Sequence, residues 1–287
     1  MPHIPARDGT RLYYEEAGQG SAVVFVHEYA GDYRTWEPQM RYFSRAHRCV
    51  SYSQRGYPPS DIPDEPGKYS QDHFRDDVIS VMDGLGIDKA HVVGHSMGAA
   101  TALHVGIKYP ERCLSVTAAG CGYGSSPDPK VVEDSRAASR ETAKMFAAET
   151  MAVAAARYGD GPTRQAHKNK DPRGYADFIR MLSEHSAKGH ALVMENLQAK
   201  RPTLWDMQAD LRKFKPPLLV LVGDEDEWCV DGSVFLRRIV PTAGLCVIPR
   251  SGHTITSEEP AAFSAAVGDL IAAAEAGRWL AHKPQGA

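Results

Sequence analysis

The chain has 287 residues, of which 43% are hydrophobic and 24% are charged, and its formal net charge at pH 7 is −3. These values are ordinary for a globular enzyme with a large core, and the charge gives no reason to expect nucleic acid as a partner. No run of about 18 apolar residues predicts a membrane span, and the N-terminus lacks the apolar segment of a signal peptide.

Short apolar segments recur along the chain and predict the strands of a sheet. Most are continuously apolar rather than alternating, which is typical of parallel strands covered on both faces. Before them, residues 7–10 (Arg-Asp-Gly-Thr) predict a turn between two short antiparallel strands. The predicted parallel strands are residues 22–26, 49–52, 90–93, 114–117, 218–222 and 245–248.

Helical patterns separate these strands. Residues 74–85 carry one apolar stripe, and Ser70 can cap that helix. Residues 97–109 are apolar nearly all round, which predicts a helix buried against the sheet and ended by Pro110. Ser257 is expected to cap a last helix. The alternation of strand and helix predicts an α/β fold with right-handed crossovers.

Strand signals stop in the middle of the chain. We interpret residues 123–211 as a helical insertion into a core formed by residues 1–122 and 212–287. The insertion has 13 Lys and Arg against 12 Asp and Glu, too balanced to predict a charged ligand. We interpret its basic cluster as a solvated face, and its larger apolar side chains as core rather than pocket lining. The cluster is Arg164, Lys168, Lys170 and Arg173, and the apolar residues are Met145, Met151, Met181, Met194, Trp205 and Met207.

The segment Gly94-His95-Ser96-Met97-Gly98 matches the pattern G-x-S-x-G between a predicted strand and a predicted helix. A serine at such a sharp turn is held in a strained backbone conformation, and its neighbours two residues away must be small. Ser96 is therefore the candidate nucleophile. The N-terminus of the following helix and the Met97 N–H would favour a developing oxyanion.

A serine hydroxyl needs a base, and the base needs an orienting acid. His253 follows the last predicted strand, where open α/β sheets carry their chemistry, and is the candidate base. Four carboxylates crowd the segment 224–227 after the preceding strand. We select Asp226 as the acid, with Asp224 as the alternative. The chain order serine, acid, histidine is the one expected of an α/β-hydrolase triad.

These motifs resemble the α/β-hydrolase superfamily over roughly two thirds of the chain. The resemblance implies an α/β-hydrolase fold, with a mostly parallel eight-stranded sheet flanked by helices and the insertion as a cap over the active site. It also implies an oxyanion hole formed by two backbone N–H groups, those of Met97 and Tyr29. The matching segments are the turn at Ser96, residues 223–226, Ser251-Gly252-His253 before Glu258-Glu259-Pro260, and Arg55-Gly56-Tyr57 with Ser60.

The sequence departs from the family pattern before Tyr29, where the family usually has His-Gly and this chain has His27-Glu28. We interpret His27 as structural, and expect the Glu28 side chain to point away into a polar network. An inward-pointing Glu28 would instead disfavour anionic substrates.

Related dehalogenases and epoxide hydrolases carry a carboxylate nucleophile, so Ser96 argues against both activities. We predict a serine hydrolase of carboxylic esters or lactones that acts on small, largely apolar substrates through an acyl-enzyme. The alternatives are a carbon–carbon bond hydrolase on the same triad and a non-catalytic receptor for a small ligand.

The prediction includes no cofactor and no metal, because no nucleotide-binding glycine loop and no metal-ligand spacing occur. Five scattered cysteines without a C-x-x-C pair fit a reducing cytoplasm. A small-molecule substrate is the one partner expected, with no nucleic acid and no membrane. Whether the chain forms a homo-oligomer is left open.

Overall fold

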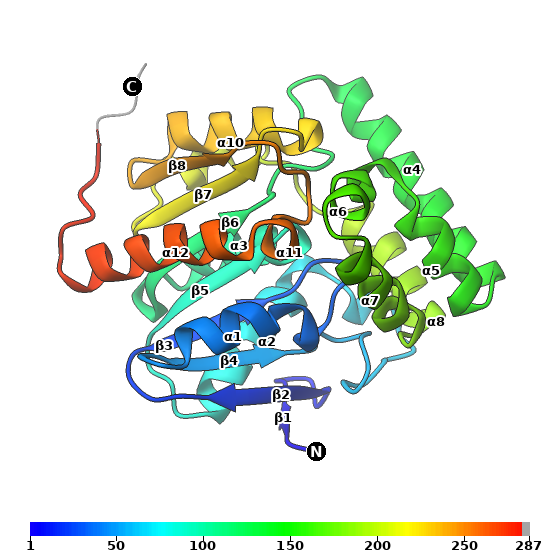
Figure 1. Cartoon of the computed structure of the whole chain (residues 1–287), viewed down its shortest axis with the longest axis horizontal. Coiled ribbons are helices and arrows are strands. Elements are labelled where there is room, and N and C mark those ends of the chain that lie inside the picture. The colour runs from blue at the N-terminus through cyan, green and yellow to red at the C-terminus, as the bar shows by residue number, and fades with distance from the viewer. Residues whose placement is uncertain (283–287) are drawn as a thin grey trace.

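The computed structural model describes residues 1–282 and contains one eight-stranded sheet (Figure 1). The strand order is β1-β2-β4-β3-β5-β6-β7-β8, in which β1–β2 and β2–β4 are antiparallel and all other pairs are parallel. The predicted α/β fold with a mostly parallel sheet is therefore confirmed. The strands are β1 (His3–Pro5), β2 (Arg11–Ala17), β3 (Ala22–Val26), β4 (Arg48–Tyr52), β5 (Ala90–His95), β6 (Cys113–Ala119), β7 (Leu218–Gly223) and β8 (Ala243–Ile248).

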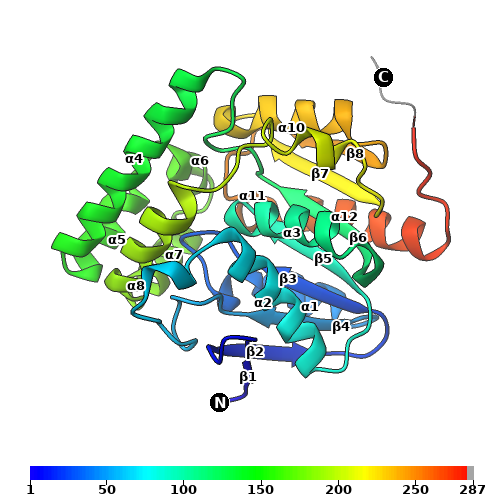
Figure 2. The same ribbon diagram turned by 180° about the vertical axis from the view of Figure 1, so that it is seen from behind.

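Helices cover the sheet in two layers, which Figures 1 and 2 show from opposite sides. Short 3-10 helices occur in the connections, namely η1 (Tyr33–Trp36), η2 (Pro66–Lys68) and η3 (Pro110–Arg112). The layers are α2 (Gln71–Gly84), α3 (Met97–Lys108) and α10 (Glu227–Ile239) on one face, and α1 (Glu37–Phe43) and α12 (Pro260–Glu275) on the other.

Strand β3 shows why most core strands are continuously apolar. Val24 and Val26 pack in the apolar cluster that contains α2 and α3, whereas Val23 and Phe25 pack in the cluster that contains α1 and α12. Successive side chains of a strand point to opposite faces, so burial of both faces demands apolar residues throughout.

The helix boundaries follow local signals in one case and not in another. Ser70 caps α2 as predicted, since its side chain accepts a hydrogen bond from the His73 N–H. The prediction that Ser257 caps the last helix is wrong. Ser257 lies inside a short helix, α11 (Ile255–Glu258), and α12 begins at Pro260, whose fixed φ suits a first helical position.

The chain between β6 and β7 contains no strand within residues 120–217 and consists mainly of helices. Figures 1 and 2 show α4 to α8 grouped beyond one end of the sheet. Within residues 1–282, every helix is too short or too polar to cross a bilayer. The helices of this segment are α4 (Pro129–Ala148), α5 (Met151–Gly159), η4 (Pro162–Arg164), α6 (Gln165–Lys170), α7 (Pro172–Ser183), α8 (Ala187–Val193), the π-helix η5 (Met194–Gln198) and α9 (Gln208–Leu211).

Candidate active site

Ser96 lies in the one-residue turn between β5 and α3. Its φ of 53° and ψ of −110° are strained for a residue with a side chain. A hydrogen bond of 2.8 Å from the Ser96 N–H to the Ala119 carbonyl on the adjacent strand holds this conformation. The turn therefore projects the hydroxyl beyond the end of the sheet.

The two glycines of the motif are required by close backbone approach. A Cβ atom at Gly94 would lie 2.1 Å from the Gly98 carbonyl oxygen, and one at Gly98 would lie 2.0 Å from the Val26 carbonyl oxygen. Backbone atoms cannot move aside as a flexible side chain can. Only glycine fits at either position while the turn keeps this shape.

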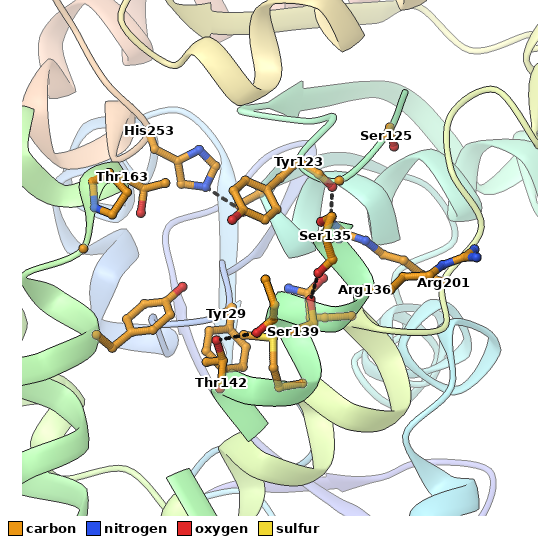
Figure 3. Close-up of a pocket in the computed structure, with 18 of the residues that line it drawn as sticks. Tyr29, Tyr123, Ser125, Ser135, Arg136, Ser139, Thr142, Thr163, Arg201 and His253 are labelled. Carbon is orange, nitrogen blue, oxygen red and sulfur yellow. Dashed lines mark hydrogen bonds between the residues drawn. The ribbon is translucent and has the colours of Figure 1, made fainter. Parts of the chain in front are cut away.

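The structure brings Ser96, His253 and Asp226 into one chain of hydrogen bonds. The Ser96 Oγ lies 2.8 Å from His253 Nε2, and His253 Nδ1 lies 2.7 Å from an Asp226 carboxylate oxygen. Figure 3 shows His253 reaching into the cavity. With Asp226 ionised, Nδ1–H donates to the carboxylate and Nε2 is free to accept the serine proton.

Asp226, not Asp224, contacts the histidine. Burial opposes ionisation of Asp226, but the neighbouring His253 more than offsets this, so the pKa of Asp226 lies below its usual range. Asp224 is exposed and accepts a hydrogen bond from the Ser251 N–H at 3.3 Å. Asp226 is thus placed to keep the Nδ1 proton on His253.

His95 has a positioning role that the sequence analysis missed. Its Nε2–H donates to the His253 carbonyl oxygen at 2.7 Å, which ties the loop of the base to the serine turn. Burial lowers the pKa of His95 to about 4, so the ring is neutral near pH 7. The variable position of G-x-S-x-G carries no sequence signal for this contact.

The N–H groups of Met97 and Tyr29, the predicted oxyanion hole, have no hydrogen-bond acceptor among residues 1–282. Met97 is the first residue of α3, where backbone N–H groups have no partner within the helix. His27 shapes the other loop, since its Nδ1–H donates to the Glu28 carbonyl at 2.6 Å while Nε2 accepts the Gln54 N–H at 3.0 Å. Both ring nitrogens of His27 serve the backbone, in keeping with a structural role.

Glu28 is buried and forms a two-pronged ion pair with Arg164 of the insertion, at 3.0 and 2.5 Å. The Arg164 guanidinium also lies over the rings of Tyr158 and Phe178. The interpretation of Arg164 as part of a solvated basic face is therefore wrong, because its side chain is only 1% exposed. Burial alone would raise the pKa of Glu28, but Arg164 lowers it to about 2.

A cavity of about 350 Å³ opens above Ser96 and His253, between the sheet and the insertion. Met145 and Met194 line it, so these two residues are not plain core as interpreted from the sequence. Met151, Met181, Trp205 and Met207 do not line it. Ser135, Ser139 and Thr142 of α4 line the same cavity as Tyr29 (Figure 3).

Asp226, Cys229 and His253 place potential metal-ligand atoms within 4.8 Å of one another. Both ring nitrogens of His253 are already hydrogen-bonded, and burial raises the pKa of the Cys229 thiol well above its usual value. A protonated thiol is a poor metal ligand. This cluster is therefore better suited to proton transfer than to metal binding.

A family model described as alpha/beta hydrolase fold matches residues 21–260. The chain is 28% identical over 288 residues to 2-hydroxy-6-oxo-6-phenylhexa-2,4-dienoate hydrolase of Burkholderia cepacia, covering 91% of each chain. It is 38% identical over 103 residues to epoxide hydrolase 1 of Caenorhabditis elegans, and this match covers only 35% of this chain and 26% of that protein. The enol-lactonase from Burkholderia xenovorans LB400 shares the fold, with a TM-score of 0.80 at 23% identity over 94% of this chain and 100% of that chain.

Gly98→Ala is expected to destabilise the protein by about 3 kcal/mol or more, because overpacking against backbone forces the turn to shift. The measurement is urea unfolding, with Gly67→Ala as the matched control, since a Cβ at Gly67 meets no atom within 4 Å. Equal stability of the two variants would contradict the close approach at the serine turn.

Arg164→Met is expected to cost about 3–5 kcal/mol, because it leaves the Glu28 carboxylate buried without a partner. The double variant with Glu28→Gln should lose less than the sum of the two single losses, measured by urea unfolding and by proteolysis of the insertion. Lys168→Met is the control, since Lys168 forms an exposed ion pair with Asp160 and lies over the Tyr175 ring but neutralises no buried charge. Additive losses would show that the two charges are not coupled.

The same pair predicts a pH dependence. The pKa of Glu28 falls from an ordinary value of 4.5 to about 2 in the folded protein, so its contribution to stability is fully present above pH 4.5 and is lost as the pH falls toward 2. Glu28→Gln should flatten the decline of the unfolding free energy over this range. An unchanged slope would mean that folding does not lower the pKa of Glu28.

Proposed function

The chain belongs to the alpha/beta hydrolase fold family, and on that premise we propose that it is a serine hydrolase of carboxylic esters or lactones. One observation carries the proposal. The Ser96 hydroxyl, the His253 ring and the Asp226 carboxylate form a continuous relay with contacts of 2.8 and 2.7 Å. This is the arrangement that acyl transfer through a serine nucleophile requires.

In the proposed mechanism, His253 Nε2 takes the Ser96 proton as the oxygen attacks the substrate carbonyl carbon. Asp226 holds the Nδ1 proton and stabilises the imidazolium that forms. The Met97 and Tyr29 N–H groups donate hydrogen bonds to the oxyanion. His253 then protonates the leaving oxygen, and water, deprotonated by the same ring, releases the acid from the acyl-enzyme.

We propose that residues 123–211 act as a cap that limits the substrate. Side chains from α4, α5 and η5 line the cavity above Ser96, which supports this role. Tyr29, Met145, Tyr158 and Met194 form the apolar part of the lining and suit a short acyl chain.

A carbon–carbon bond hydrolase on the same three residues is the second candidate. Its support is the similarity to the dienoate hydrolase of Burkholderia cepacia, which extends over 91% of both chains. Epoxide hydrolysis is disfavoured, because the nucleophile position holds Ser96 rather than a carboxylate and the similarity spans about a quarter of that relative. A non-catalytic receptor would have no use for the Ser96–His253 contact.

Ser96→Ala is expected to lower ester hydrolysis by roughly 10⁴-fold or more without changing the urea midpoint, since it removes the nucleophile and little packing. Ser139→Ala is the matched control, because Ser139 lines the same cavity but lies on α4. A fluorophosphonate probe should label the wild type at Ser96. Retained hydrolysis in Ser96→Ala, or no labelling of the folded wild type, would refute the proposed function.

A panel of methyl esters, lactones and a vinylogous diketone separates the two reaction types on one nucleophile. Ester and lactone turnover above diketone cleavage is expected. Diketone cleavage with little ester turnover would favour the second candidate.

A further inference from the structure

Among residues 1–282, the cavity above Ser96 is lined by three arginines and by no Asp or Glu. They are Arg136 on α4, Arg157 on α5, and Arg201 after η5. The sequence of the insertion is nearly balanced in charge, but the Lys, Arg, Asp and Glu residues among the described lining of the cavity are all arginines. This asymmetry arises from the fold and is invisible in the composition.

Within the described residues two of these arginines form no direct ion pair, although the charge of Arg136 helps to lower the pKa of Asp206. Arg157 is exposed and pairs with Glu149 at 2.7 Å. Among residues 1–282, no carboxylate oxygen lies within 4.0 Å of Arg136 or Arg201. Of the two, Arg201 makes one hydrogen bond, from Nη2 to the Tyr123 carbonyl at 2.9 Å, which leaves the other N–H donors of its guanidinium available.

The surroundings of Arg201 make its charge costly. Burial lowers the pKa of Arg201, and its neighbours Cys121, Cys229 and Tyr123 are uncharged near pH 7. Arg201 is half-buried, so its guanidinium is partly removed from water without a counter-ion, and an anion that binds beside it offsets part of that cost. Arg201 is therefore better placed to bind an anion than Arg157, which is exposed and already paired.

The two acidic groups beside the site, Glu28 and Asp226, already have hydrogen-bond partners. Glu28 is held by Arg164, and Asp226 is hydrogen-bonded to His253. Neither carboxylate lines the cavity. The concern raised by the sequence, that Glu28 would repel an anionic substrate, therefore does not apply to this arrangement.

We propose that the substrate carries a carboxylate in addition to the bond that is cleaved, and that Arg201 binds this carboxylate, with Arg136 as a second positive group. The planar guanidinium fork matches a carboxylate in a two-pronged contact. The apolar part of the lining would then hold a short chain between the carboxylate and the carbonyl over Ser96. This inference rests on the proposed function and names the substrate class of the same site.

The test compares two esters of equal length, monomethyl adipate and methyl hexanoate, which differ in a terminal carboxylate against a methyl group. Wild type should prefer the anionic ester in kcat/KM. Arg201→Gln should lower the ratio of anionic to neutral kcat/KM by roughly 10- to 100-fold, the loss expected for a charged hydrogen-bonded pair. Arg201→Lys, which keeps the charge but loses the fork, should lower it less.

Arg157→Gln is the matched control, because this arginine lines the cavity but is already paired with Glu149. It should keep the wild-type ratio. An equal ratio in wild type and Arg201→Gln, with the neutral ester still hydrolysed, would overturn the inference and leave the proposed function standing.

A binding measurement separates the two proposals further. Calorimetry should detect monomethyl adipate on Ser96→Ala and show at least a tenfold weaker complex on the double variant Ser96→Ala with Arg201→Gln. Equal binding by both proteins would overturn the inference. Arg201-dependent binding without fluorophosphonate labelling of the wild type would support the anion site while refuting the serine hydrolase.

Discussion

The backbone contact between the serine turn and the end of β3 is the constraint on which the site depends. Gly98 lies so close to the Val26 carbonyl that no side chain fits between them, and Gly94 is packed as tightly against Gly98. This proximity lets β5 reverse into α3 within one residue. Because the turn is held by backbone rather than by side chains, the Ser96 hydroxyl has a fixed position relative to the sheet.

Two contacts then locate the other groups relative to that turn. His95 ties the serine turn to the His253 backbone, and Glu28 ties the loop of Tyr29 to the insertion through Arg164. The second contact joins segments 136 residues apart. A buried pair of this kind adds little net stability, but breaking it is expensive, so it specifies one arrangement of the insertion over the site.

Electrostatics distinguishes this cavity from a plain apolar acyl pocket. The negative groups near Ser96 are each committed to a positive or proton-donating neighbour, whereas Arg136 and Arg201 are committed to no carboxylate within the described chain. The arginines of the lining favour anionic molecules beside the nucleophile, as proposed above.

Much of the fold was predictable because it depends on local patterns. Short apolar segments, most of them continuous, predicted every parallel strand, and G-x-S-x-G predicted where a strand must turn sharply into a helix. Chain order pointed to the acidic segment 224–227, and Asp226, which we selected from it with Asp224 as the alternative, is the carboxylate that contacts His253. Ser257 was misassigned because a capping residue and a residue inside a short helix look alike in sequence.

The amino-acid sequence by itself determined the α/β architecture, the position of the serine turn and the order of the three candidate groups, since each depends on neighbours a few residues away. Only the tertiary structure decided the partner of Glu28, the contact of His95 with the loop of the base, and the arginines that face the cavity. These depend on side chains that are far apart in sequence and meet because the insertion folds back over the sheet, and no local pattern records which of them will meet.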